Sequence, residues 1–190
     1  FWAFLNENGD AYDTFSKTRN PYGGLLQGGR NKAQLATYRA IGKVTFDFDK
    51  YVKGFNISAN AAYKLVREDY TEQKNEVQYY DWVGNKTGSK NGPGSLKEQN
   101  KKWENVTLGA FANYDRTFMD VHHVKAMLGM TAEQETYKQV GAKRNMGPLY
   151  PGSDLVDLDV WVSGTNNEAY GGQDSWGFVS YLTRLNYDYA

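Results

Sequence analysis

The sequence predicts an all-β fold in which antiparallel strands form part of a large transmembrane outer-membrane β-barrel. Three observations predict it. Apolar side chains recur at every second position in five segments, at about 34–49, 54–67, 103–118, 121–137 and 175–189. These segments hold roughly 13–17 residues each, whereas strands of soluble proteins typically hold about 5–6. Their connections alternate between short turns and long loops, as in barrels with periplasmic turns and extracellular loops.

The composition excludes several classes of protein. Lysine plus arginine and aspartate plus glutamate number 22 each, so no basic excess indicates nucleic-acid binding. The sequence has no cysteine, which excludes a disulfide framework and thiol chemistry. No run approaches the ~18–20 apolar residues of a membrane-spanning helix, but a membrane strand needs only about 9–11 residues.

The first two segments separate apolar from polar side chains. In 34–49 the even positions are mostly apolar, and the odd positions include Arg39 and Lys43. In 54–67 the odd positions are apolar, and Lys64 lies on the other face. Because successive side chains of a strand point to opposite faces, each segment has one face suited to lipid and one suited to a wet interior.

The other three segments show the same alternation. In 103–118 Asp115 lies opposite an apolar row, and Phe111 is an exception among the polar positions. In 121–137 and 175–189 the polar rows include Lys125 and Arg184, respectively. Six residues are therefore predicted to face the lumen, either along the transport route or as a solvated barrel wall: Arg39, Lys43, Lys64, Asp115, Lys125 and Arg184.

Aromatic residues gather near the predicted strand ends. One group lies at the short-turn end: Phe46, Phe48, Tyr51, Phe55, Phe118, Tyr187 and Tyr189. A second group lies toward the long-loop end: Tyr38, Tyr63, Tyr137 and Trp176. The ten residues from 38 to 48, at ~3.3 Å each and a tilt of about 40°, span roughly 25 Å, close to the apolar band between the aromatic girdles of membrane barrels.

Three stretches together resemble the SusC/RagA family of TonB-dependent outer-membrane transporters. The first, NPYGGLLQGGRNKAQLATYRAIGKVTFDFD (20–49), has an Asn-Pro loop and a Gly-Arg before a strand with Arg-x-x-Gly. The second is HVKAMLGMTAEQE (123–135), and the third, which is the most specific, is GGQDSWGFVSYLTRLNYDY (171–189). The resemblance covers most of residues 20–189 and rests on the order and spacing of the motifs.

The resemblance implies a plug domain inside a large barrel in the outer membrane of a Gram-negative cell, in contact with its lipid. It also implies energy supplied through TonB, a SusD-like surface lipoprotein as a lid, and an oligosaccharide or, less often, a peptide as cargo. Five strands, or six if residues 1–5 end another, cannot close such a barrel, because known ones start at eight. The plug domain and the remaining strands are therefore expected outside this chain.

The expected long loops, at about 68–102 and 138–174, contain aromatic residues. Five of them are candidates for contact with substrate or lid: Tyr79, Tyr80, Trp82, Trp161 and Tyr170. Exposed aromatic rings can stack on sugar rings, and they can equally pack inside a folded loop. The family's substrate contacts come mostly from plug and loops, so no binding residue is carried over by motif.

Three groups of polar residues could form metal or catalytic sites, but for each a structural role is preferred. His122 and His123 are adjacent on a strand and point to opposite faces, which disfavours a shared metal. Glu133 and Glu135 lie about 6.6–7 Å apart on one face; such spacing occurs in glycosidases, but a polar wall is preferred. An acidic loop group lacks the EF-hand spacing for calcium: Asp154, Asp157 and Asp159. No catalytic residue, metal or cofactor is predicted, and the chain is not expected to be an enzyme.

These observations predict TonB-dependent active import of a bulky nutrient, with an oligosaccharide as the preferred cargo. One alternative is a soluble β-sandwich or calycin-like carbohydrate-binding module, whose strands should be shorter and whose outward faces should be polar. A second is a small complete outer-membrane barrel acting as a pore or adhesin, against which the strand count argues.

Overall fold

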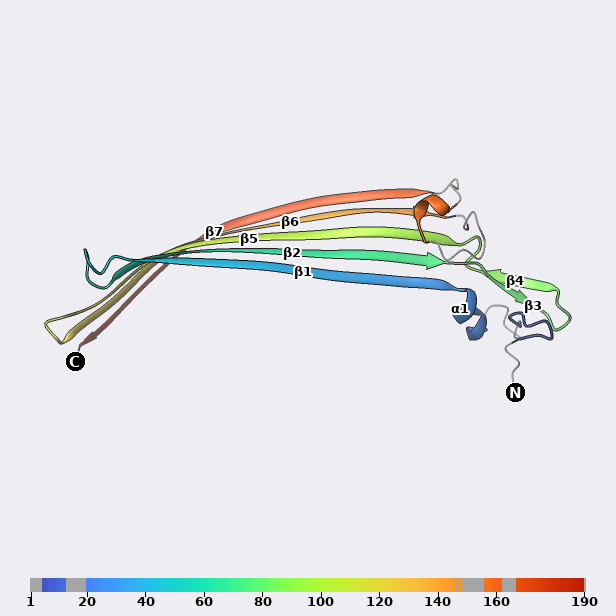
Figure 1. Cartoon of the computed structure of the whole chain (residues 1–190), viewed down its shortest axis with the longest axis horizontal. Coiled ribbons are helices and arrows are strands. Elements are labelled where there is room, and N and C mark those ends of the chain that lie inside the picture. The colour runs from blue at the N-terminus through green and yellow to red at the C-terminus, as the bar shows by residue number, and fades with distance from the viewer. Residues whose placement is uncertain (1–4, 13–19, 146, 148–155, 162–166, 190) are drawn as a thin grey trace. The chain divides into compact units, whose positions relative to one another are not determined.

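The computed structural model describes residues 5–12, 20–145, 147, 156–161 and 167–189. Five long strands form one antiparallel sheet in the order β1-β2-β5-β6-β7 (Figure 1). Their bounds are β1 Gly29–Asp47, β2 Phe55–Lys74, β5 Ser95–Phe118, β6 His122–Arg144 and β7 Glu168–Tyr189. Among these five strands, neighbours in the sheet are also consecutive along the chain, as in an up-and-down meander. None of the described helices is long and apolar enough to span a bilayer.

Short elements lie between or before the long strands. They are α1 (Pro21–Gln27), the hairpin strands β3 (Val77–Tyr80) and β4 (Lys86–Lys90), and the 3-10 helix η1 (Leu158–Val160). Asn20 caps α1, because its Oδ1 accepts hydrogen bonds from the backbone N–H groups of Tyr22 and Gly23 at 2.9 and 3.2 Å. Proline follows at the start of the helix, where its missing N–H costs nothing.

The long strands extend beyond the predicted bounds toward the loops. β2 continues to Lys74 rather than 67, and β5 begins at Ser95 rather than 103, so much of the expected loop 68–102 is strand. Similarly, β6 ends at Arg144, and β7 begins at Glu168 within the expected loop 138–174. These extensions are richer in polar residues than the central parts of the strands, so their alternation signal is weak. Cross-strand ion pairs accompany the ladder there, such as Lys101–Glu68 at 3.1 Å.

The chain divides into two compact units, which we describe separately. The turn unit comprises Ala36–Arg67, Lys102–Lys138 and Gly172–Ala190. Its two tight turns need left-handed backbone conformations, with φ of 78° at Gly54 and of 52° and 60° at Met119 and Asp120. The N–H of Gly54 donates to Oδ1 of Asp49 at 2.6 Å, and its carbonyl accepts from the N–H of Asp115 at 2.8 Å.

The loop unit comprises Phe1–Leu35, Glu68–Lys101 and Gln139–Gly171. It contains a small apolar core in which Ala11, Val77 and Tyr79 are almost fully buried. Gly23 of α1 faces this core, and a methyl group there would come within 2.8 Å of the Ala11 Cβ and 3.4 Å of the Tyr79 ring. The absence of a side chain at position 23 therefore lets the helix approach the β3–β4 hairpin closely.

Candidate functional site

One face of the sheet in the turn unit is polar and joined across strands by side-chain hydrogen bonds. Asn113 of β5 donates to Oδ1 of Asn56 on β2 at 2.9 Å. Asn105 of β5 donates to Oε1 of Glu133 on β6 at 2.7 Å. These contacts show which residues share this polar face: the even positions of β2 and the odd positions of β5 and β6.

The six residues predicted to face a lumen lie on exposed positions of this polar face. Asp115 and Lys125 form an ion pair at 3.2 Å and share a hollow of about 390 Å³ with Arg184. Lys43 lines a second hollow, of about 440 Å³, with Ser58, Asn60, Phe111 and Asn113 among its other residues. By strand alternation, Arg39 falls on the same face as Lys43 in β1, and Lys64 on the same face as Asn60 in β2. Whether this face borders a lumen stays a prediction.

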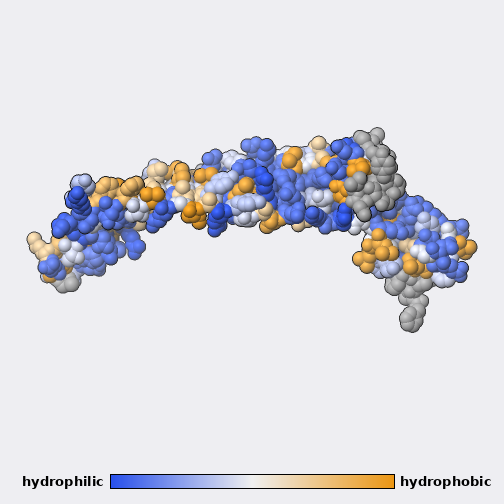
Figure 2. Space-filling view, viewed as in Figure 1, coloured by the Kyte–Doolittle hydropathy of each residue, from blue (hydrophilic) through white to orange (hydrophobic). Residues whose placement is uncertain are grey.

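The opposite face of the turn unit exposes a row of large apolar side chains. The residues are Tyr38, Val44, Phe46, Leu108, Leu128, Met130, Tyr181, Leu185, Tyr187 and Tyr189. Apolar residues reach the surface along the strands in Figure 2. Near the turn between β5 and β6, His122 Nδ1 lies 2.8 Å from the Tyr187 hydroxyl, and its ring lies 5.2 Å from that of Tyr189. Aromatic residues thus gather near the short turns.

Phe111 departs from the alternation because two glycines make room for its ring on the polar face. A methyl group at Gly129 of β6 would lie 2.7 Å from the Phe111 Cδ1, and one at Gly109 would lie 3.0 Å from its Cε2. Leu182 of β7 is the next neighbour of the Gly129 position, at 3.5 Å. The ring therefore covers bare backbone of two strands, and the glycines at 109 and 129 are the sequence signal for it.

The five aromatic candidates occupy different environments. Tyr79 is 1% exposed and Trp161 is 0% exposed, so both are packed inside the loop unit, which is one of the two roles weighed for aromatic residues of the long loops. Tyr80 is half-buried in β3, and its hydroxyl donates to Gln78 at 2.8 Å. Tyr170 is half-buried in β7 rather than in a loop. Trp82 is 47% exposed, and its Nε1 donates to Glu7 at 3.1 Å.

The turn that carries Trp82 is held by a local carboxylate. Asn85 donates to Asp81 twice, from its backbone N–H to Oδ1 at 2.7 Å and from its Nδ2 to Oδ2 at 2.9 Å. These hydrogen bonds, first from the side chain and then from the backbone, hold the pKa of Asp81 below its usual value because they favour the charged form. The indole of Trp82 makes an edge-on contact with Tyr12, with ring centroids 5.8 Å apart.

The three polar groups weighed as chemical sites are engaged in structural contacts. His122 contacts Tyr187, whereas His123 binds Asp115 at 2.7 Å on the other face. Glu133 accepts from Asn105, and Asp157 caps η1 by accepting from the N–H of Asp159. Asp154 lies outside the described residues. Within the described part of the chain, no group of three or more His, Asp or Glu is arranged to hold a metal ion.

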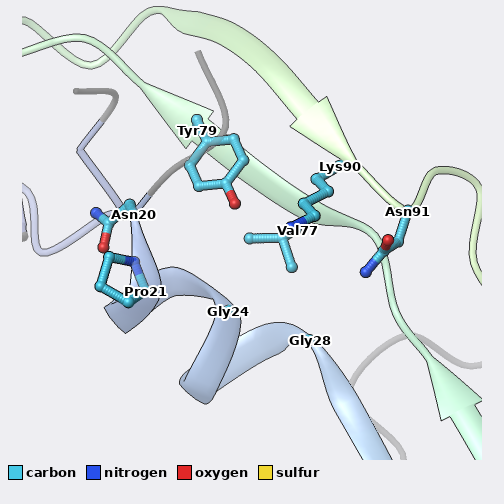
Figure 3. Close-up of a pocket in the computed structure, with 8 residues that line it drawn as sticks. All are labelled: Asn20, Pro21, Gly24, Gly28, Val77, Tyr79, Lys90 and Asn91. Carbon is cyan, nitrogen blue, oxygen red and sulfur yellow. The ribbon is translucent and has the colours of Figure 1, made fainter. Parts of the chain in front are cut away.

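A pocket of about 400 Å³ lies between α1 and the β3–β4 hairpin of the loop unit (Figure 3). Its lining residues are Asn20, Pro21, Gly24, Gly28, Val77, Tyr79, Lys90 and Asn91. The Asn20 side chain is engaged on both sides, because it caps α1 and its Nδ2 donates to the Tyr12 carbonyl at 2.8 Å. The pocket is therefore mainly the gap between a helix and a hairpin that are already joined by structural contacts.

A more specific arrangement lies on the polar face of the loop unit, where Lys97 of β5 lies between two tyrosines. Its ammonium nitrogen is 5.8 Å from the ring centroid of Tyr70 on β2 and 5.6 Å from that of Tyr170 on β7. The Tyr170 hydroxyl donates to Oε1 of Gln99 at 3.3 Å. A methyl group at Gly141 would come within 2.6–2.8 Å of the Tyr170 ring and hydroxyl, so this glycine leaves space for them. We call these five residues the tyrosine–lysine cluster.

Sequence reasoning found only one member of this cluster, Tyr170. The other four lie in the segments 68–102 and 138–174, which the sequence predicts as long loops. Continuing the alternation of β2 and β5 past the predicted ends would have placed Tyr70 and Lys97 on the polar face. The position of Gly141 opposite an aromatic residue repeats the relation between Gly129 and Phe111.

No protein-family model matches the chain, and no curated protein matches it. Solved structures do match. They include the RagAB peptide transporter (TM-score 0.65) and the RagAB peptide importer in its closed-closed (0.68) and open-open (0.65) states, each at 17% identity over 96% of this chain. The likeness is one of fold. The chain spans only 19% of the length of each transporter chain, so it has the fold of a section of a large barrel, all-β and antiparallel as the sequence predicted.

Proposed function

We propose that this chain is a section of the wall of an outer-membrane barrel of the SusC/RagA kind, which imports a bulky nutrient with energy from TonB. One observation carries the proposal: in the turn unit most exposed large apolar side chains lie on one face of the sheet, and cross-strand hydrogen bonds join polar side chains on the other. That division suits strands with lipid on one side and water on the other. In a soluble protein, so many exposed large apolar residues would favour association.

The edges of the sheet support placement within a larger barrel. β1 and β7 lie at the two ends of the strand order, so each has one side without a strand partner in the described sheet. Unpaired backbone groups cost several kcal/mol each in hydrocarbon, so membrane strands occur in closed barrels. We propose that the strands completing the barrel, and a plug domain within it, belong to the same protein outside residues 1–190.

The proposed partners are TonB, a SusD-like surface lipoprotein as lid, and outer-membrane lipid. The sequence resemblance favoured an oligosaccharide as cargo, whereas the solved structures with this fold are described as peptide transporters. The proposed cargo is therefore an oligosaccharide or a peptide. The function is gated passage rather than bond chemistry, with this section as a rigid wall and with its long connections at the outer surface.

The proposal can be tested on the protein in its native membrane. We expect it in the detergent-extracted outer membrane as a large species that migrates anomalously on electrophoresis until it is boiled. Deleting its gene, or removing TonB, should abolish uptake of one class of labelled oligosaccharide or peptide. A water-soluble species near 21.5 kDa would instead overturn the proposal and favour a soluble β-domain.

A further inference from the structure

We propose that the tyrosine–lysine cluster binds a carboxylate group of the imported cargo. The inference rests on the proposed function, because it needs the polar face of the sheet to be reached by cargo. It deepens that function by naming the chemistry of the ligand. The carboxylate can come from a peptide or from an acidic sugar, and the experiment below distinguishes these two sources.

The charge of Lys97 is the first reason. Its ammonium lies over two tyrosine rings, and such contacts stabilise a cation by about 0.5–1 kcal/mol each at exposed sites but do not neutralise it. Among the described residues, no carboxylate oxygen lies within 4 Å of this ammonium. Lys97 therefore keeps a positive charge to offer to an anion.

The neighbouring carboxylates are the second reason, because each already has a closer lysine. Glu72 pairs with Lys74 at 2.5 Å, and Glu168 pairs with Lys143 at 3.6 Å. Glu72 also lies within electrostatic reach of Lys97 and Lys143. These two glutamates are thus paired with Lys74 and Lys143, and Lys97 is not paired with either of them.

The fixed position of one aromatic ring, that of Tyr170, is the third reason. Tyr170 is held by its hydrogen bond to Gln99 and fits over the backbone at Gly141. Tyrosine rings present large apolar surfaces at a low cost in side-chain entropy. A cation between two such rings suits a carboxylate attached to an apolar or ring-shaped body, such as the end of a peptide or a uronic acid.

The location of the cluster is the fourth reason. It lies in the loop unit, together with α1, the β3–β4 hairpin and η1. Under the proposed function, the long connections are on the outer surface, so cargo reaches this unit first. The cluster would thus act as an early contact on the wall rather than as a structural attachment for the plug.

The test compares ligand pairs that differ only in charge, on the full-length native protein in detergent. One pair is an acidic peptide with a free carboxyl terminus and its amidated, glutamine-substituted form. The other pair is an oligogalacturonate and its methyl ester. The variants are Lys97→Met, which removes the charge but keeps the apolar stem, and Lys97→Arg, which keeps the charge. Lys53→Met, at an exposed position in the turn between β1 and β2, is the matched control.

We expect Lys97→Met to weaken binding of a charged ligand about tenfold or more, in line with the loss of a hydrogen bond to a charged group. Its neutral counterpart should bind the variant and the wild type alike, and Lys97→Arg should retain most of the affinity. The affinity should also fall as salt is raised. If Lys97→Met weakens binding of the charged peptide alone, the cargo is a peptide. If it weakens binding of the charged sugar alone, the cargo is an acidic glycan.

Two outcomes overturn the inference: equal loss for charged and neutral ligands, or no binding of either charged ligand to the wild type. Location and boiling-dependent mobility are measured on the same samples. A folded outer-membrane protein that is indifferent to Lys97→Met refutes the carboxylate site alone. A wild-type protein that is absent from the outer membrane refutes the proposed function itself.

Discussion

The contact between Phe111 and Gly129 tests how the polar face of the turn unit is assembled. In Gly129→Ala the new Cβ would lie 2.7 Å from Cδ1 and 2.9 Å from Cε1 of Phe111, whereas ordinary contacts begin at 3.4 Å. The ring must therefore move by about 0.7 Å. It cannot slide freely along the sheet, because its other side already lies close to the backbone of Gly109.

The expected cost of Gly129→Ala is about 1–2 kcal/mol of unfolding free energy. Overpacking a well-filled site typically costs about 1–3 kcal/mol, and the half-exposed Phe111 ring can relieve part of the overlap by tilting toward solvent. In the background Phe111→Ala the same substitution should cost close to nothing, because the ring that it would meet is gone. The two positions should thus show a coupling energy of about 1 kcal/mol or more.

The assay is a denaturant titration of the full-length protein in lipid vesicles, with the folded fraction read from unboiled electrophoresis. Four proteins complete the cycle: wild type, each single variant and the double variant. Gly42→Ala is the control, because a methyl group there meets nothing within 4 Å. An equal penalty for Gly129→Ala with and without the Phe111 ring, or an equal penalty for Gly42→Ala, would refute the reasoning.

Three further predictions concern other parts of the chain. Gly54→Ala should destabilise the barrel by about 2–4 kcal/mol in the same titration, because alanine disfavours φ of 78° and its Cβ would overlap the Asp115 carbonyl oxygen. An unchanged denaturant midpoint would contradict this prediction. The ionised form of Asp81 should stabilise its turn at pH values above the usual carboxyl pKa of 3.8, and this stabilisation should be lost as the pH falls through the lower pKa of the folded state. The hydrogen-exchange protection of the Asn85 amide, corrected for intrinsic exchange rates, should therefore decrease below about pH 4. Protection that does not depend on pH would disprove this role. Trp161→Phe should change the unfolding free energy by less than about 1 kcal/mol, because the buried Nε1 has no acceptor among the described residues. Trp161→Ala should cost about 3–5 kcal/mol. A large loss with phenylalanine would instead reveal a hydrogen bond from Nε1.

The central parts of the strands could be predicted from sequence because one face of each is apolar. In β1, for example, Val44 and Phe46 alternate with Lys43 and Asp47, and a shift of one residue would exchange the faces. The outer parts could not be predicted in this way. Around Glu68 both faces are polar, and the strand is continued there by backbone pairing and cross-strand contacts, which have no periodic signature in the sequence.

The candidate site was less predictable because it depends on which strands become neighbours. Tyr70, Lys97 and Tyr170 come from three different strands, and the sequence gives no spacing that joins them. The roles of Tyr79 and Trp161 stayed open from the sequence for a related reason: an aromatic residue in a long connection can be exposed or can form the core of that connection. For Tyr79, the small residues Ala11 and Gly23 that pack against it were the available signal.

The open edges of the sheet also bear on how this section can be handled as a recombinant protein. β1 and β7 hold 19 and 22 residues, and in the described sheet each leaves a row of backbone donors and acceptors without a partner strand. Long edges of this kind are templates for pairing with further copies, and exposed apolar faces add to that tendency. Expressed without its flanking strands, the segment is expected to accumulate as insoluble cross-β aggregates. A fragment intended for biochemical study or as an antigen should therefore include the next hairpin on each side.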